Sequence, residues 1–285
     1  MALNSVFIGL VSHSKSSFAQ NRGPSGLSAK LAQGFGALGV SCQIQVNTAN
    51  LFDENEFALT AAMARASVRE EIRLESAWFQ FLERQDRVGQ GVRVVGRWIH
   101  FALKWRLNSQ TKELRRLLNI EYSHVDLYRQ GVESGCDLVI LLEDDAFAED
   151  PESLAGNLVG LLDFPDVPKM INLSTSFSLS EIGIEHLLTQ VPSVAWSGSS
   201  VRAVLSSSRP ATNTVCAIAF RADFLRDVVA DFDSQPLKPV VPIDWKLNAS
   251  LMRLWASGSI GARECWFIEP GPVLQLSMRR DSVDK

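Results

Sequence analysis

The stretch Asp137–Glu143 (DLVILLE) constrains the fold of this 285-residue chain more than any other part of it. Its apolar residues form one unbroken run, which is typical of a strand buried on both faces of a sheet. Three acids, Glu143, Asp144 and Asp145, stand together where this strand ends. Ligands of open α/β sheets bind beyond the carboxyl ends of the strands. The sequence therefore predicts an α/β fold with a carboxylate cluster at a ligand-binding edge.

The first fifty residues have the pattern of a βαβ-like unit. Val6–Val11 is a short apolar run with β-branched members, and Cys42–Val46 is a second candidate strand. Between them we expect a helix over Ser25–Leu38 that ends at Gly39. Its apolar positions are spaced by four, four and three residues, at Leu27, Leu31, Phe35 and Leu38.

The interval from about residue 54 to residue 131 is strongly helical and carries no strand signal. We therefore expect a single domain over residues 1–285 with a helical insertion at about residues 54–120. Further strands are expected at Lys169–Leu173, Val215–Phe220 and Cys265–Ile268. Further helices are expected at Pro151–Leu162, Ala222–Phe232 and Asp244–Ala256.

Composition narrows the class of protein. A length of 285 residues fits one large domain, and 46% hydrophobic with 21% charged residues is ordinary for a globular chain. The net charge of −4 argues against a protein that coats nucleic acid. No basic signal-peptide start and no run of 18 apolar residues occurs, and the four cysteines lie far apart. We expect a cytoplasmic protein with reduced thiols that fill its core, at most peripheral on the inner face of a membrane.

The acid cluster itself suggests a metal site. Three adjacent carboxylates repel one another, and a divalent cation would neutralise them. Carboxylate oxygens suit Mg²⁺ or Mn²⁺, which in turn can bridge a diphosphate. The alternative is a solvated turn that closes a strand. The buried strand directly before the acids, and Phe147 with a new helix soon after them, favour the site.

Three blocks in order carry a family resemblance. GCDLVILLEDDAF (135–147) resembles the metal-binding strand of GT-A glycosyltransferases, and its EDD form is similar to that of family 25, the lipopolysaccharide and collagen-type galactosyltransferases. NTVCAIAFRADFLRDVV (213–229) with PVVPIDWKLNASL (239–251) resembles a later strand-helix element and a Pro-x-Asp segment. EPGPVLQLSMRRDS (269–282) resembles the closing Pro-rich strand. Residues 54–120 have no equivalent in these blocks.

The resemblance implies a GT-A-like, Rossmann-like fold, with a mixed and mainly parallel sheet and helices on both faces. It implies transfer of a hexose, with inversion, from a nucleotide diphosphate sugar, first of all a UDP-sugar, to a glycan or lipid-linked acceptor in surface polysaccharide or glycoconjugate biosynthesis. Asp144 and Asp145 would hold Mn²⁺ or Mg²⁺, Glu143 would support them or contact the ribose, and Gln275 would contact the donor.

Asp244 is the residue that the resemblance implies as the catalytic base. A carboxylate there would take the proton of the acceptor hydroxyl as its oxygen attacks the anomeric carbon. The position also suits a helix N-cap, which Asp favours. Both roles stay open at this point, and they are compatible.

Two loops are candidates for donor contacts. Ser12, His13 and Lys15, with Arg22 further along, follow the first strand, and the cations among them would pair with phosphate oxygens. Asn47 follows the second strand and is a candidate contact to the base or ribose. The alternative is an ordinary polar loop, since the P-loop pattern GxxxxGK[ST] is absent.

Residues 92–107 carry two adjacent stripes at helical spacing. The apolar stripe comprises Val94, Trp98, Phe101 and Trp105. The basic stripe comprises Arg93, Arg97, His100 and Lys104. The wider segment 84–116 has nine Lys or Arg against two acids, a local net charge of +7. This pattern favours either a helix whose aromatic face packs on the sheet or one that lies on an anionic membrane. A phosphorylated or acidic acceptor is a third partner for the cations.

Two other classes of function compete with the glycosyltransferase. Metal-dependent nucleotidyl or phosphoryl transferases also use paired carboxylates, but they need a cradle of cations around the phosphates. A non-catalytic, transferase-like scaffold is the second alternative. A serine hydrolase is disfavoured because no GxSxG motif occurs, and the separated histidines form no HExxH set. His124 is expected to be a helix residue near the site.

Overall fold

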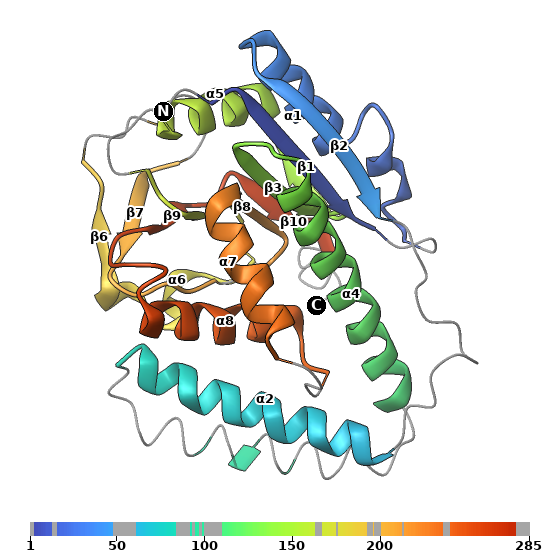
Figure 1. Ribbon diagram of the computed structural model, residues 1–285, viewed down its shortest axis with the longest axis vertical. Coiled ribbons are helices and arrows are strands. Elements are labelled where there is room, and N and C mark those ends of the chain that lie inside the picture. The colour runs from blue at the N-terminus through green and yellow to red at the C-terminus, as the bar shows by residue number, and fades with distance from the viewer. Residues whose placement is uncertain are drawn as a thin grey trace, which may run out of the picture.

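A computed structural model describes residues 3–12, 16–47, 61–83, 92, 95–96, 99, 110–162, 167–174, 176–192, 196, 201–212, 214–235 and 240–277. Its centre is an eight-stranded sheet (Figure 1). In order across the sheet, the strands are β2 (Ser41–Asn47), β1 (Ser5–Val11), β3 (Leu138–Glu143), β8 (Ala217–Arg221), β5 (Met170–Asn172), β9 (Cys265–Glu269), β7 (Ala203–Ser207) and β6 (Leu188–Gln190). All of these run in one direction except β8 and β7. The predicted mixed, mainly parallel sheet is confirmed.

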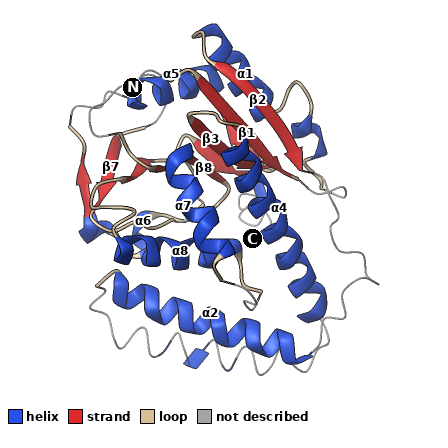
Figure 2. Cartoon of the chain, viewed as in Figure 1, coloured by secondary structure: helices blue, strands red, loops and turns tan. Residues whose placement is uncertain are grey.

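Helices cover both faces of the sheet (Figure 2). Alternate residues of β3 point to opposite faces, so Leu138, Ile140 and Leu142 join the core on one side, and Val139 and Leu141 join the core on the other. The first core contains residues of α1 (Leu27–Ala37) and α5 (Pro151–Leu162). The second contains residues of α4 (Gln110–Glu133), α7 (Ala222–Asp233) and α8 (Ile243–Ser257). This explains why β3 is an unbroken apolar run.

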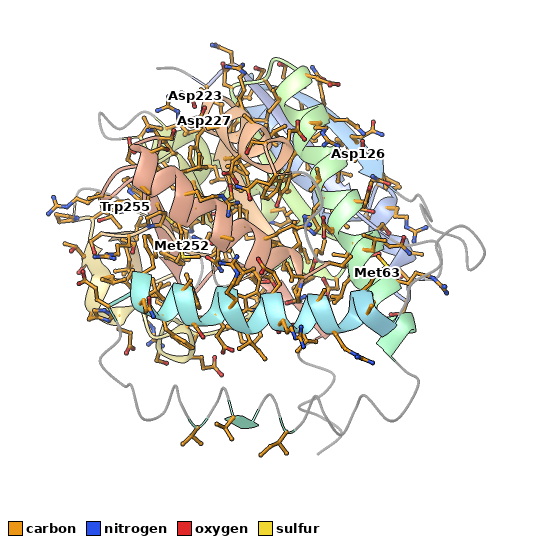
Figure 3. All side chains as sticks on the ribbon, turned by 60° about the horizontal axis from the view of Figure 1, so that its bottom comes forward. Met63, Asp126, Asp223, Asp227, Met252 and Trp255 are labelled. Carbon is orange, nitrogen blue, oxygen red and sulfur yellow. The ribbon has the colours of Figure 1, made fainter. Side chains whose placement is uncertain are left out.

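Helix α2 (Ala61–Phe81), inside the predicted insertion, lies against α8 rather than on the sheet (Figures 1 and 3). Trp78 meets Trp245 edge to face with ring centroids 5.3 Å apart, and Phe81 meets Trp255 in the same manner at 6.3 Å. At the end of α2, Arg209 donates to the Phe81 carbonyl. Most of the striped segment 92–107 lies outside the described residues. Of its described members, Val92, Val95 and Ile99 are exposed.

A second, two-stranded sheet pairs β4 (Ala146–Ala148) with β10 (Val273–Gln275) in antiparallel register. Because β4 follows the three acids directly, this pairing brings the C-terminal segment beside them. Three further elements among the described residues are short: η1 (Ala19–Arg22), α6 (Leu179–Ile182) and η3 (Glu185–Leu187).

The longer elements expected from the sequence are confirmed within a few residues. Helix α1 ends one residue before Leu38, and Gly39 then takes a positive φ of 79°, as expected of a helix stop. The four cysteines are free thiols, and three of them are buried. Among the described residues, no helix combines the length and the apolarity needed to cross a bilayer.

Candidate active site

Three strand ends meet where the acids emerge. Val11, the last residue of β1, pairs with Asn47 of β2 on one side and with Glu143 of β3 on the other. Ser12 continues this ladder, since its N–H donates to the Asn47 carbonyl at 3.0 Å. The parallel register therefore gathers predicted site residues from three distant segments at the carboxyl edge of the sheet.

Glu143 is held from two sides. His124 of α4 places its Nε2 3.3 Å from Oε1, and Gln275 of β10 donates its amide N–H to Oε2 at 3.1 Å. His124 is fully buried, with 0% of its side chain exposed. Gln275, predicted to contact a donor, thus has its amide on Glu143. The orientation of this carboxylate is therefore set by two other elements, α4 and β10.

Asp145 is a buried acid, with only 7% of its surface exposed. Its carboxylate accepts hydrogen bonds from the Ser277 hydroxyl and, at 3.9 Å, from the Cys216 thiol. Burial raises the pKa of Asp145, and the charges of Glu143 and Asp144 raise it further, against the opposing effect of the Ser277 hydrogen bond. The ionised form is therefore costly in the absence of a positive charge.

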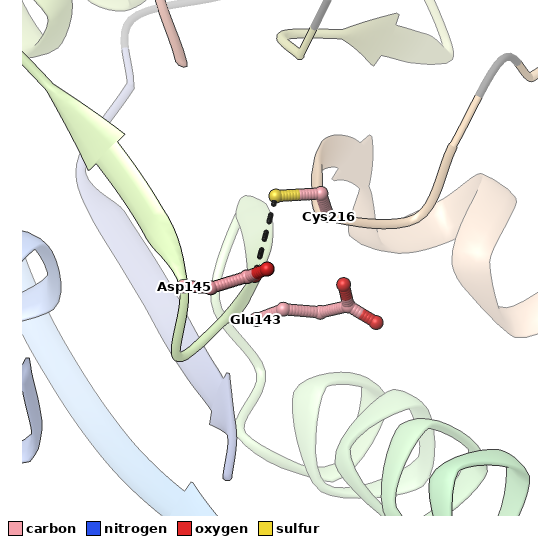
Figure 4. Close-up of side chains that lie close together, drawn as sticks. All are labelled: Glu143, Asp145 and Cys216. Carbon is pink, nitrogen blue, oxygen red and sulfur yellow. Dashed lines mark hydrogen bonds between the residues drawn. The ribbon is translucent and has the colours of Figure 1, made fainter. Parts of the chain in front are cut away.

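Glu143, Asp145 and Cys216 form a possible ligand set (Figure 4). One ligand atom from each lies within 4.8 Å of the others. Cys216 reaches this position because the antiparallel β3–β8 pairing continues beyond the strands, where the Glu143 N–H donates to the Cys216 carbonyl at 2.8 Å. The two carboxylates supply the oxygen ligands that Mn²⁺ and Mg²⁺ prefer, so the donor chemistry fits the predicted cation.

Asp144 has a different set of contacts from its two neighbours. Its Oδ2 accepts from the Ser12 hydroxyl at 2.6 Å, and the Asn21 amide donates to its backbone carbonyl at 2.6 Å. Arg22 then donates from Nε to the Ser12 oxygen at 2.6 Å. Ser12 and Arg22 are thus linked to the acid cluster, and Asp144 joins that cluster to the loop after β1. The carboxylate that shares a possible ligand set with Asp145 is that of Glu143.

Asp244 lies in the first turn of α8, but it is not the N-cap. The cap position is Pro242, which makes no side-chain cap hydrogen bond, so the N-cap interpretation is wrong. The Asp244 carboxylate does not cap the helix. It accepts a hydrogen bond from the Val215 N–H at 3.0 Å. Burial raises the pKa of Asp244 to about 6, and the charge of Glu143 adds to this, whereas His124 and the Val215 N–H oppose it. A pKa near neutrality suits a general base.

Asn47 lies at the edge of the site, where its side chain is hydrogen-bonded to α4. Its amide donates to Oδ2 of Asp126 at 3.0 Å, and that oxygen also accepts from the Gln130 amide at 2.8 Å. Its predicted contact with a base or ribose remains a prediction. His13 and Lys15 lie outside the described residues.

Several site residues were not identified as such from the sequence. Cys216 was assigned to the core, and Ser277 lay in the third resemblance block without a role. His124 was expected to be a helix residue near the site, but it was given no role there. The sequence hint for Ser277 was that it lies in the third resemblance block. No local pattern marks a serine that donates to a carboxylate 132 positions away.

Comparisons with known proteins add no family. No protein-family model matches the chain, and a search of the curated proteins finds no significant match. The chemistry that the site can perform therefore follows from the side chains that it contains. These are two adjacent carboxylates beside a buried thiol, an acid of raised pKa nearby, and an arginine linked through Ser12 to the third carboxylate.

Proposed function

We propose that this chain is a metal-dependent glycosyltransferase of the GT-A type. It transfers a hexose, with inversion, from a nucleotide diphosphate sugar to a hydroxyl of a glycan or lipid-linked acceptor. The observation that carries the proposal is the convergence of Glu143 and Asp145 with Cys216 at the end of a buried strand. The mixed, mainly parallel sheet and the β4–β10 pairing support the GT-A assignment, because they put the first and third resemblance blocks side by side.

Glu143 and Asp145 would hold the cation. Bound there, Mn²⁺ or Mg²⁺ would neutralise the charge that develops on the departing diphosphate. Asp145 is well placed to hold it, because a buried acid of raised pKa is stabilised by a positive charge more than an exposed acid is. On the other side of the cluster, Arg22 is hydrogen-bonded to Ser12, and its guanidinium is a cation of the kind that pairs with the phosphate oxygens of a donor.

Asp244 supplies the base. It accepts the proton of the acceptor hydroxyl as that oxygen bonds to the anomeric carbon and the bond to the diphosphate breaks. Burial and the charge of Glu143 raise the pKa of Asp244 to about 6, so that it can bind a proton near neutral pH. The Val215 N–H holds one of its oxygens, which leaves the other for the acceptor.

The proposal is tested with a panel of nucleotide sugars, with and without Mn²⁺, by release of nucleoside diphosphate. Wild-type protein is expected to hydrolyse or transfer one donor only when Mn²⁺ is present, and Asp145→Ala is expected to lose this activity. Turnover of free nucleotides instead would point to a nucleotidyl or phosphoryl transferase. The absence of any donor turnover would favour the scaffold.

A matched control for Asp145→Ala is Asp227→Ala, which removes an exposed acid on α7, remote from the cluster in sequence. It is expected to leave Mn²⁺-dependent turnover unchanged. Equal loss in both variants would mean that the effect of Asp145→Ala is not specific to the cluster, which counts against the metal role.

A further inference from the structure

His124 is the polar group that α4 delivers to the site. It is fully buried, and its Nε2 lies 3.3 Å from Glu143 Oε1, while Gln275 donates to the other oxygen of the same carboxylate. Glu143 therefore has one hydrogen-bond partner on each oxygen, from two elements far apart in the chain. Burying an imidazole against a carboxylate is costly unless the pair is well oriented.

The tautomer of His124 follows from its surroundings. Glu143 accepts on the Nε2 side, whereas Nδ1 is buried and has no hydrogen-bond partner among the described residues. A proton on Nδ1 would be a buried donor without an acceptor, which is unfavourable. The proton is accordingly on Nε2 and points at Glu143.

Helix α4 is fixed against its neighbours close to His124. One turn earlier, Glu121 forms a largely buried ion pair with Lys246 of α8, two residues beyond Asp244. One turn later, Tyr128 meets the His124 ring edge to face, with centroids 6.0 Å apart, and stacks on Phe232. Packing along α4 thus holds the imidazole in place, and the position of α4 therefore determines where His124 bonds Glu143.

We propose that His124 is a positioning residue for the acid cluster. Through its Nε2–H it orients the Glu143 carboxylate toward Asp145, so that the two acids are preorganised for a divalent cation and a diphosphate. This inference rests on the proposed function, because it assigns the cation and the diphosphate to Glu143 and Asp145. It adds that α4, which lies before the first resemblance block, takes part in building the site.

The test compares His124→Gln with His124→Asn. The glutamine amide reaches about as far from the backbone as Nε2 of histidine, whereas the asparagine amide reaches only about as far as Nδ1. Both variants put a primary amide in the same buried place, but only glutamine can replace the bond to Glu143. Affinity for MnCl₂ together with UDP is measured by calorimetry, and melting temperatures are recorded for each variant.

We expect His124→Asn to weaken Mn²⁺-dependent UDP binding by about tenfold to a hundredfold, as is usual when a partner that orients a metal ligand is lost. His124→Gln is expected to bind within about threefold of wild type. His186 provides the matched control, since its Nε2 also bonds a fixed acceptor, the Leu82 carbonyl at 2.8 Å, on the α2 side of the molecule. His186→Asn should leave the affinity unchanged.

Equal affinity in both His124 variants and wild type would overturn the positioning role, and so would equal losses in both variants that track their melting temperatures. Asp145→Ala separates this failure from a failure of the proposed function. If Asp145→Ala loses Mn²⁺-dependent binding while His124→Asn keeps it, only the role of His124 is wrong. If wild type itself binds UDP equally with and without Mn²⁺, the metal-dependent function is wrong.

Discussion

The carboxyl edge around Glu143 and the contact between α2 and α8 are built on opposite principles. At the edge, acids and polar groups from distant segments are partly withdrawn from water, and the pKa of both Asp145 and Asp244 is raised. At the α2–α8 contact, aromatic rings such as Trp78 and Trp245 meet edge to face. The first arrangement costs stability and the second supplies it, which is the division expected between a site and its supporting structure.

The largest effect should come from removing an aromatic residue at the α2–α8 contact. Trp78 is buried, and its Nε1 has no hydrogen-bond partner among the described residues, so its contribution is apolar packing. Trp78→Ala should lower the free energy of unfolding by about 3–5 kcal/mol. Urea denaturation measures this, with Gln80→Ala on the exposed face of the same helix as control. A loss below about 1 kcal/mol would mean that α2 is not docked as described.

At the carboxyl edge of the sheet we expect a smaller effect on stability, of opposite sign. Folding raises the pKa of Asp244 from an ordinary 3.8 to about 6, so the folded state binds a proton that the unfolded state releases between these values. The contribution of Asp244 to the free energy of unfolding is therefore most favourable below about pH 4. It falls as the pH rises to about 6 and is constant above that. Asp244→Asn keeps an oxygen for the Val215 N–H and removes the charge.

This substitution should raise the free energy of unfolding at pH 8 by up to about 3 kcal/mol and change it little at pH 4. It should also abolish turnover. Thermal or urea unfolding at the two pH values, without added metal, measures the difference, with Asp227→Asn as the exposed control. Stabilisation that is the same at both pH values would show that the charge of Asp244 is not the cause.

The smallest effect is expected on the outer surface of α2. Arg73 pairs with Glu70 one turn earlier, and its side chain is 64% exposed. Exposed pairs of this kind contribute little, so Arg73→Ala should change the free energy of unfolding by less than about 0.5 kcal/mol. A loss close to that of Trp78→Ala, measured by the same denaturation, would contradict the view that only the inner face of α2 stabilises the fold.

The two regions also differ in how far the sequence predicts them. β3 and its three acids were predictable, because an apolar run ending in carboxylates is a local signal. The contacts of those acids were not, since Gln275, which was expected at the donor, and Ser277 reach Glu143 and Asp145 through a strand pairing across more than a hundred residues. Asp244 was identified through the resemblance, but sequence alone did not exclude the N-cap role. The structure excludes it because Pro242 occupies the N-cap position and α8 begins at Ile243.

His124 illustrates the same limit from a helix. The sequence places it on a helix near the site, and the tertiary packing of α4 against the sheet turns its ring toward Glu143. Likewise, Cys216 has the pattern of a core residue in a strand, and it is buried in the core one residue before β8 begins. Its place beside Asp145 follows from the antiparallel direction of β8, which a single apolar run does not specify.

The most direct test of the account is a crystal structure of the protein soaked with MnCl₂ and UDP. We predict an anomalous manganese peak between the carboxylates of Glu143 and Asp145, with the diphosphate bound to the metal and the Arg22 side chain near its phosphates. Strong diffraction data with UDP bound elsewhere, or with no anomalous peak at those two acids, would contradict the central claim.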